Sequence, residues 1–115
     1  MNLATTTSAV PSQSPPRPTD DQRFDQDLGS SQRVLVKFTA DWCPPCHALE
    51  PTLEKLSLER ADVLVLSLEV EANPRTAERF GIRSLPTLIA FDQGQPVGQL
   101  VGNVSRAKID DLLGA

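Results

Sequence analysis

The two cysteines of this 115-residue chain stand three positions apart, in the segment Cys43-Pro44-Pro45-Cys46. A disulfide between them would close a very short loop and would remove little entropy from the unfolded chain, so stability is a poor reason for the pair. A cysteine thiolate is a nucleophile, and a second thiol one helical turn away can attack the mixed disulfide that the first one forms. The spacing therefore predicts thiol–disulfide exchange.

The elements around the pair are expected to place Cys43 at the N-terminus of a helix. A continuous apolar run at 34–38 predicts a buried strand, and the apolar pattern after the pair predicts a helix to about Arg60, kinked at Pro51. Free backbone N–H groups and the helix dipole favour a thiolate at such a terminus. We therefore expect Cys43 to be the nucleophile and Cys46, less exposed, to be the resolving thiol.

The rest of the pattern predicts an α/β fold, a mixed sheet with helices on both faces. We read Thr19-Asp20-Asp21 as the start of a short helix that Gly29 ends. Further elements are expected in this order: a strand at 63–70, a short helix at 73–81, a strand at 88–91, a turn at 92–95, a strand at 97–101 and a last helix capped by Ser105. The first strand–helix–strand crossover requires parallel pairing.

Residues 1–18 differ in composition from the rest, with four of the ten prolines, many Ser and Thr, and no acidic residue. Because proline removes backbone donors and blocks both helix and central strand, we expect a disordered tail at 1–18 and one domain at 19–115. A proline-rich docking or targeting segment is the alternative for this tail. Since 14–18 makes a poor strand, the sheet is expected to have four strands, or five with a weak edge.

Four landmarks make the chain resemble the thioredoxin family from about residue 19 to 113. They are Ala40-Asp41-Trp42-Cys43 with Pro45-Cys46, then Pro51 inside the active-site helix, then Gly81-Ile82-Arg83-Ser84-Leu85-Pro86-Thr87, and last Gly94 and Gly102. The resemblance implies a thioredoxin fold, with a cis bond before Pro86 facing the disulfide. It also implies a substrate-binding surface made by Trp42, Pro44, Pro45, Ile82, Leu85, Pro86 and Gly102. The Leu85 backbone would pair with an extended substrate segment.

Three internal positions depart from the family pattern. Pro44 replaces the usual glycine and deletes an N–H near the thiolate, which leaves the reduction potential open over roughly −270 to −120 mV. Lys37 replaces a buried aspartate beneath the resolving cysteine, and Ser67 replaces the lysine that pairs with that aspartate. Because an ammonium stabilises a nearby thiolate, Lys37 is a candidate for tuning the thiols toward a more oxidising couple. The alternative is that Lys37 snorkels outward and covers apolar surface.

We expect a protein-disulfide reductase, which takes its electrons from a separate reductase or a small thiol because the chain lacks a dinucleotide-binding glycine pattern. An oxidising or isomerising exchanger is one alternative, and a non-enzymatic thioredoxin-like binding module is another. His47 is interpreted as a solvent-facing residue, or as one that tunes thiol electrostatics when protonated.

The expected site needs no cofactor and no metal. Cys43 through His47 match a haem-attachment pattern, but haem needs a second axial ligand, and His47 and Met1 are the only histidine and methionine. A structural zinc site needs four ligands, more than two thiols and one imidazole supply.

The composition excludes some partners. A net charge of −4 argues against nucleic acid, and the sequence has no run of about 18 apolar residues that would span a membrane. The N-terminus lacks the basic start and apolar stretch of a signal peptide. We therefore expect a cytoplasmic monomer that acts on disulfide-containing proteins, in electron transport and cell redox homeostasis.

Overall fold

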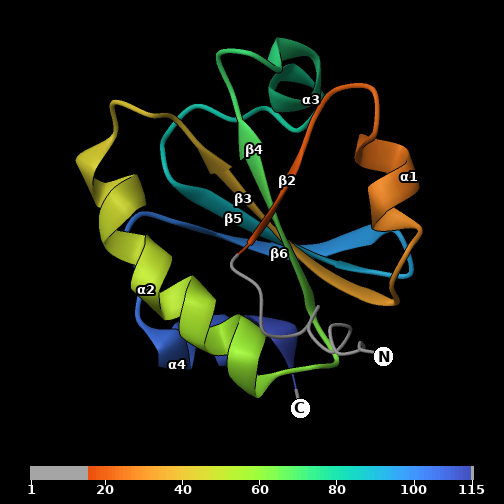
Figure 1. Ribbon diagram of the computed structural model, residues 1–115, viewed down its shortest axis with the longest axis vertical. Coiled ribbons are helices and arrows are strands. Elements are labelled where there is room, and N and C mark those ends of the chain that lie inside the picture. Colours follow the sequence, from red (N-terminus) through yellow and green to blue (C-terminus); the bar gives the residue numbers. More distant parts are fainter. Residues whose placement is uncertain (1–15, 115) are drawn as a thin grey trace, which may run out of the picture.

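A five-stranded mixed sheet organises the computed structural model, which describes residues 16–114 (Figure 1). Its strands are β2 (Arg17–Thr19), β3 (Arg33–Thr39), β4 (Leu64–Glu69), β5 (Thr87–Asp92) and β6 (Gln95–Val101). They lie in the order β2-β4-β3-β5-β6, in which β2, β4 and β3 are parallel and both β5 and β6 pair antiparallel. The predicted mixed sheet is confirmed, with five strands.

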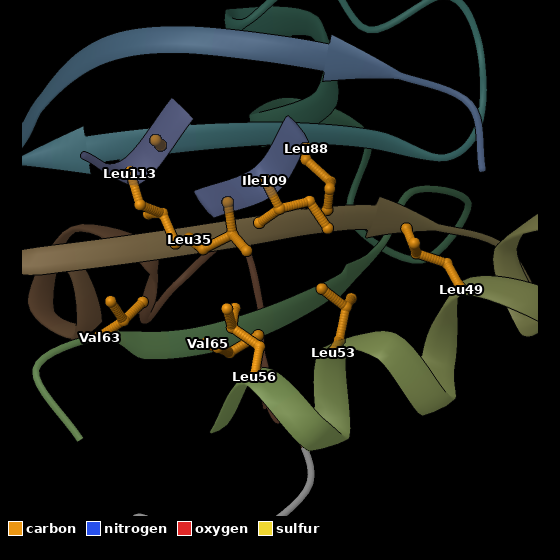
Figure 2. Close-up of a cluster of buried hydrophobic side chains, with 10 residues drawn as sticks. Leu35, Leu49, Leu53, Leu56, Val63, Val65, Leu88, Ile109 and Leu113 are labelled. Carbon is orange, nitrogen blue, oxygen red and sulfur yellow. The ribbon is translucent and has the colours of Figure 1, made fainter. Parts of the chain in front are cut away.

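Four helices cover the two faces of this sheet. They are α1 (Phe24–Leu28), α2 (Pro44–Glu59), α3 (Pro74–Arg79) and α4 (Arg106–Leu113). Helices α2 and α4 pack on one face and bury the cluster in Figure 2, to which α2 contributes Leu49, Leu53 and Leu56. Helix α1 packs on the opposite face, where Phe24 and Leu28 join a second buried cluster. The expectation of helices on both faces is confirmed.

Side chains of β3 alternate between these two clusters, as strand geometry requires. Val34, Val36 and Phe38 belong to the cluster on the α1 side, whereas Leu35 belongs to the cluster under α2. Lys37 lies two residues after Leu35 and therefore also faces α2. The alternation therefore places Lys37 on the face of the sheet where α2 packs its leucine side chains.

The boundary predicted for the N-terminal tail was wrong at its end. Arg17 and Pro18 pair with Leu66 and Ser67 of β4 and extend the sheet. Pro18 is tolerated because β2 is an edge strand, where a residue without an N–H leaves no internal ladder bond unmade. Residues 1–15 lie outside the described part of the chain, and the tail remains a prediction for them.

The helix predicted to start at Thr19-Asp20-Asp21 starts later, at Phe24, although it ends before Gly29 as expected. Thr19 is the last residue of β2, and its hydroxyl donates to the carboxylate of Asp27 at 2.7 Å. The Asp20 carboxylate accepts hydrogen bonds from the backbone N–H groups of Gln22 and Arg23, which holds a turn rather than a helix.

Asp21 caps α3, a helix far from it in the sequence. Its carboxylate accepts hydrogen bonds from the N–H and hydroxyl of Thr76, at 2.8 and 2.7 Å, and from the N–H of Arg75 at 3.1 Å. Desolvation opposes ionisation, but these bonds outweigh it and lower the pKa of Asp21 below its ordinary value. Asn73 supplies no side-chain cap, so Asp21 does the work of an N-cap residue from outside the helix.

The C-terminal half follows the predictions closely. Gln93 and Gly94 form the two-residue turn between β5 and β6, and both have positive φ, at 53° and 81°. This is the backbone that a tight hairpin requires and that glycine adopts without strain. The Ser105 hydroxyl accepts a hydrogen bond from the N–H of Lys108 and caps α4, as predicted.

Candidate active site

Cys43 and Cys46 form a disulfide at the N-terminus of α2, with their Cα atoms 5.3 Å apart. Cys43 is the N-cap residue, and its Sγ accepts a hydrogen bond from the N–H of Cys46 at 3.3 Å. Cys43 is 3% exposed and Cys46 is fully buried, the order expected of a nucleophile and a resolving thiol. Pro44 is the first residue of the helix, where a backbone N–H would have no helical partner. A proline at this position therefore does not disturb the helix.

An open groove of about 350 Å³ runs beside Cys43. The residues that line it are Trp42, Cys43, Pro44, Pro45, Val70, Ile82, Arg83 and Leu85. Five of the predicted substrate-binding residues are therefore brought together with the nucleophile. Val70 and Arg83 were not predicted, because neither residue type signals a site until the fold brings the end of β4 and the segment before β5 next to Cys43.

The peptide bond between Leu85 and Pro86 is cis, as the resemblance implied. Pro86 is buried and does not line the groove. The N–H of Gly102 donates to the carbonyl oxygen of Pro86 at 2.8 Å, and Gly102 has a φ of 95°, a conformation that favours glycine. Gly102 therefore does not line the groove itself, but its hydrogen bond holds the Pro86 backbone in place next to the groove residue Leu85.

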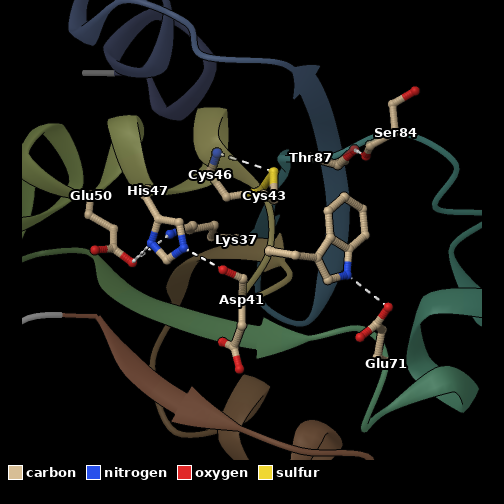
Figure 3. The surroundings of a disulfide bond; sticks show 10 residues. Lys37, Asp41, Cys43, Cys46, His47, Glu50, Glu71, Ser84 and Thr87 are labelled. Carbon is tan, nitrogen blue, oxygen red and sulfur yellow. Dashed lines mark hydrogen bonds and ion pairs between the residues drawn. A yellow bond between two sulfur atoms is a disulfide. The ribbon is translucent and has the colours of Figure 1, made fainter.

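Trp42 stands at the rim of the groove rather than in the core. Its side chain is 63% exposed, and its Nε1 donates a hydrogen bond to the Glu71 carboxylate at 2.8 Å (Figure 3). This bond holds the indole at a fixed orientation directly before Cys43. A large apolar ring that stays exposed is suited to contact another molecule.

Lys37 is buried on the face of the sheet that α2 covers. Its side chain is 2% exposed, and its Nζ lies 3.4 Å from Oε2 of Glu50 on α2. Burial lowers the pKa of Lys37 below the ordinary lysine value, and the nearby Glu50 carboxylate opposes that change only in part. The alternative in which Lys37 snorkels into water was wrong. Ser67 is the register partner of Lys37 on β4, so the residue beside Lys37 on that strand is uncharged.

His47 is exposed on the first turn of α2 and contacts the loop before the disulfide (Figure 3). Its Nε2 lies 2.7 Å from the carbonyl oxygen of Asp41, and its Nδ1 lies 3.7 Å from Oε2 of Glu50. Because a carbonyl only accepts hydrogen bonds, Nε2 must carry a proton. The solvent-facing interpretation is confirmed, and the contact with Asp41 adds an anchor for the active-site loop.

Within residues 16–114, no group of three or more His, Cys, Asp or Glu side chains is arranged to hold a metal ion. The described helices also include none that is both long and apolar enough to cross a membrane.

Comparisons with known proteins agree with this geometry. A family model described as Thioredoxin matches residues 16–115. A thioredoxin of Mycobacterium tuberculosis is 47% identical over 83 residues, which cover 71% of this chain and 72% of the relative. A bifunctional thioredoxin reductase/thioredoxin of Mycobacterium leprae is 41% identical over 92 residues, which cover 79% of this chain and 20% of that protein. A mutant thioredoxin from Halobacterium salinarum has a TM-score of 0.83 at 33% identity, with 92% of each chain covered.

Proposed function

The chain belongs to the thioredoxin family and is a thiol–disulfide oxidoreductase with the thioredoxin fold, and on that premise we propose that it reduces disulfide bonds in protein substrates. The observation that carries the proposal is the Cys43–Cys46 disulfide at the N-terminus of α2, beside an open groove with apolar walls. A reductase needs one reachable sulfur and one protected sulfur, and Cys43 lines the groove whereas Cys46 does not.

The proposed reaction exchanges one disulfide for another. In the reduced protein the Cys43 thiolate attacks one sulfur of the substrate disulfide, and the other substrate sulfur leaves as a thiolate and takes up a proton. The Cys46 thiolate then attacks Sγ of Cys43, so the mixed disulfide breaks and the second substrate sulfur leaves. Two electrons pass to the substrate, and the protein is left with the Cys43–Cys46 disulfide.

The groove supports binding of an extended peptide. Ile82, Leu85 and Val70 offer apolar contacts beside Cys43, and Trp42 adds a large exposed ring. We propose that Leu85 pairs with the substrate backbone while Pro86, held by Gly102, fixes that segment. Pro44 and Pro45 present a rigid surface with no N–H donors at the helix start.

We propose a separate reductase as the source of electrons, acting on Cys43–Cys46 when the protein is oxidised. The Mycobacterium leprae relative carries both names, thioredoxin reductase and thioredoxin, in one chain, which supports this kind of partner. A small thiol is the alternative donor. We also propose that the protein works as a monomer in the cytoplasm, in electron transport and cell redox homeostasis.

The test is the reduction potential of the Cys43–Cys46 couple, measured by equilibration in glutathione buffers. A potential of roughly −250 mV or below is expected, because only a strongly reducing couple drives disulfide reduction in a substrate. A potential of roughly −200 mV or above would contradict the proposal and indicate an oxidising or isomerising exchanger. Turnover of a disulfide-bonded protein such as insulin, with dithiothreitol as the donor, should be lost in Cys43→Ser. Equal turnover in that variant would instead favour a binding module.

A further inference from the structure

Lys37 is a buried cation that packing alone does not explain. Its neighbours in the sheet, Ser67 and Leu88, are uncharged, and the core cluster on this face of the sheet consists of aliphatic side chains. Taking an ammonium out of water costs free energy, and an apolar residue of the same length would fill the space without that cost. Its presence calls for a function that uses the charge.

The charge lies beneath the first turns of α2. Strand β3 runs toward Cys43, so Lys37 lies further along it toward the active site than Leu35, which packs under α2. Glu50, the partner of Lys37, lies four residues after Cys46 and therefore on the same face of the helix. Figure 3 shows the Lys37 side chain running under this part of α2, toward Glu50.

Cys46 is the fully buried thiol near the start of α2, and the reaction of this thiol would use such a charge. Burial disfavours the thiolate that must form before Cys46 can attack Cys43. A buried ammonium offsets this penalty, because a nearby opposite charge favours the ionised form. The Glu50 carboxylate cancels only part of this field, since its side chain is 49% exposed and water screens it.

The Glu50 carboxylate is the one charged group that an ion pair in the described structure places against the Lys37 ammonium. The groups that face Lys37 from α2 are Glu50 and, through the same carboxylate, His47, whose Nδ1 lies 3.7 Å from it. From β4 and β5 they are the uncharged Ser67 and Leu88. A protonated His47 would add positive charge at the exposed side of the cluster, whereas Lys37 supplies it at the buried side.

We propose that Lys37 assists the resolving step by stabilising the Cys46 thiolate, and that Glu50 positions its ammonium and keeps it charged. In that step the Cys46 thiolate attacks Sγ of Cys43, a Cys43–Cys46 bond forms and the mixed disulfide breaks. The departing thiolate takes a proton from solvent. The inference rests on thiol exchange at this pair and does not depend on the direction of electron flow.

The two steps can be separated with dithiobis-nitrobenzoate, a small aromatic disulfide that releases a coloured thiolate. Attack by Cys43 releases the first equivalent, and resolution by Cys46 releases the second. In Lys37→Met the second phase should slow by about three- to tenfold at about pH 7, and its pH–rate profile should move to higher pH. This slowing is smaller than the expected fall in the amount of Cys46 thiolate, because a thiolate of higher pKa is also a stronger nucleophile. The first phase should change much less.

Two matched variants separate the local charge from net charge and from packing. Lys55→Met removes a lysine that is exposed on the same helix and should leave both phases unchanged. Lys37→Arg keeps a cation and should restore most of the rate of the second phase. An unchanged second phase in Lys37→Met, in both rate and pH profile, would overturn the proposal, as would equal slowing of both phases.

Glu50→Gln provides a test that leaves the buried side chain in place. Without the carboxylate the pKa of Lys37 falls further, because Glu50 is the group that raises it. The second phase should then slow at alkaline pH, where Lys37 is discharged, and should not slow at acidic pH. A profile identical to that of the unmodified protein would contradict the role of the pair. Because the probe is not a protein, failure here would leave the proposed reductase function standing.

Discussion

The two ends of α2 carry charged clusters of opposite character. At the C-terminal end, Arg60 contacts Asp62 at 2.9 Å and Asp110 of α4 at 3.5 Å, and Arg106 of α4 contacts Glu59 at 2.6 Å. Both guanidinium groups keep part of their surface in water. At the N-terminal end, the buried Lys37 has a carboxylate at 3.4 Å that is itself half in water.

This difference indicates what each cluster is for. The C-terminal cluster links α2 to α4 with ion pairs that are partly exposed to water, each of which contributes about 0–1 kcal/mol. The N-terminal cluster holds a desolvated cation, which opposes folding, at the end of the helix where the disulfide is reduced and reformed. We infer that the ion pairs at the C-terminal end of α2 stabilise its packing, whereas the buried cation at the N-terminal end serves the reaction of the disulfide.

Leu49 and Leu56 are fully buried near the two ends of the same helix, so their truncation gives the largest expected effects. Leu49→Ala and Leu56→Ala should each lower the free energy of unfolding by about 2–5 kcal/mol, because each leaves a cavity in the same cluster. Urea unfolding measures this loss. Only Leu49→Ala, one turn from Cys46, should also change the exchange rate after correction for the folded fraction. Equal changes in both variants would mean that the two ends are not functionally distinct.

Methionine substitutions of the two central cations should change stability in opposite directions. Lys37→Met should leave the free energy of unfolding unchanged or raise it by up to about 2 kcal/mol, because the desolvation cost disappears while Glu50 can turn to solvent. Arg60→Met should lower it by about 1 kcal/mol, because Arg60 also bonds the carbonyl oxygen of Gly114 at 3.0 Å. Chemical denaturation of both variants measures the two effects. A large decrease in the free energy of unfolding of Lys37→Met would mean that the Lys37–Glu50 ion pair stabilises the fold, and the two ends of α2 would then not differ in this respect.

The two clusters should also differ in how they change the free energy of unfolding with pH, and this effect should be smaller than those of the substitutions above. The folded-state pKa of Lys37 is lowered, so between that pKa and the ordinary value of 10.5 the unfolded chain binds more protons and stability rises with pH. Hydrogen bonding and ion pairing with Arg60 lower the pKa of Asp62 below 3.8, so its contribution is present above that value and is lost as the pH falls through the folded-state pKa. Urea midpoints as a function of pH should lose the alkaline rise in Lys37→Met and the matching part of the acid loss in Asp62→Asn. An alkaline rise that persists without Lys37 would assign it to another group.

Local sequence signals predicted most of the elements that position the site. The apolar run at 34–38 and the leucine spacing after Cys46 require a buried strand followed by an amphipathic helix, and the structure has both. Cys43 and Cys46 could be assigned roles because the strand–helix junction fixes which sulfur caps the helix. The cis bond before Pro86 came from the family resemblance, since nothing local in the sequence specifies that isomer.

The features that could not be predicted are contacts between distant residues. Strand β2 exists because β4 offers an unpaired edge, which the composition of the segment does not reveal. Val70 and Arg83 line the groove only after the sheet has formed. Lys37 and Glu50 are 13 residues apart, and their pairing depends on how α2 lies across β3.

The Asp21 cap on α3 also bears on the order in which the molecule folds. Its bond to Thr76 closes a loop of 55 residues, a separation at which the entropy of closure must be met before the contact stabilises anything. Helix α3 leads directly into the segment that carries Ile82, Arg83 and Leu85, one wall of the groove. The Asp21 carboxylate therefore ties the start of the described chain to the helix that precedes this wall, so the wall takes its place only when residues 55 positions apart have come together.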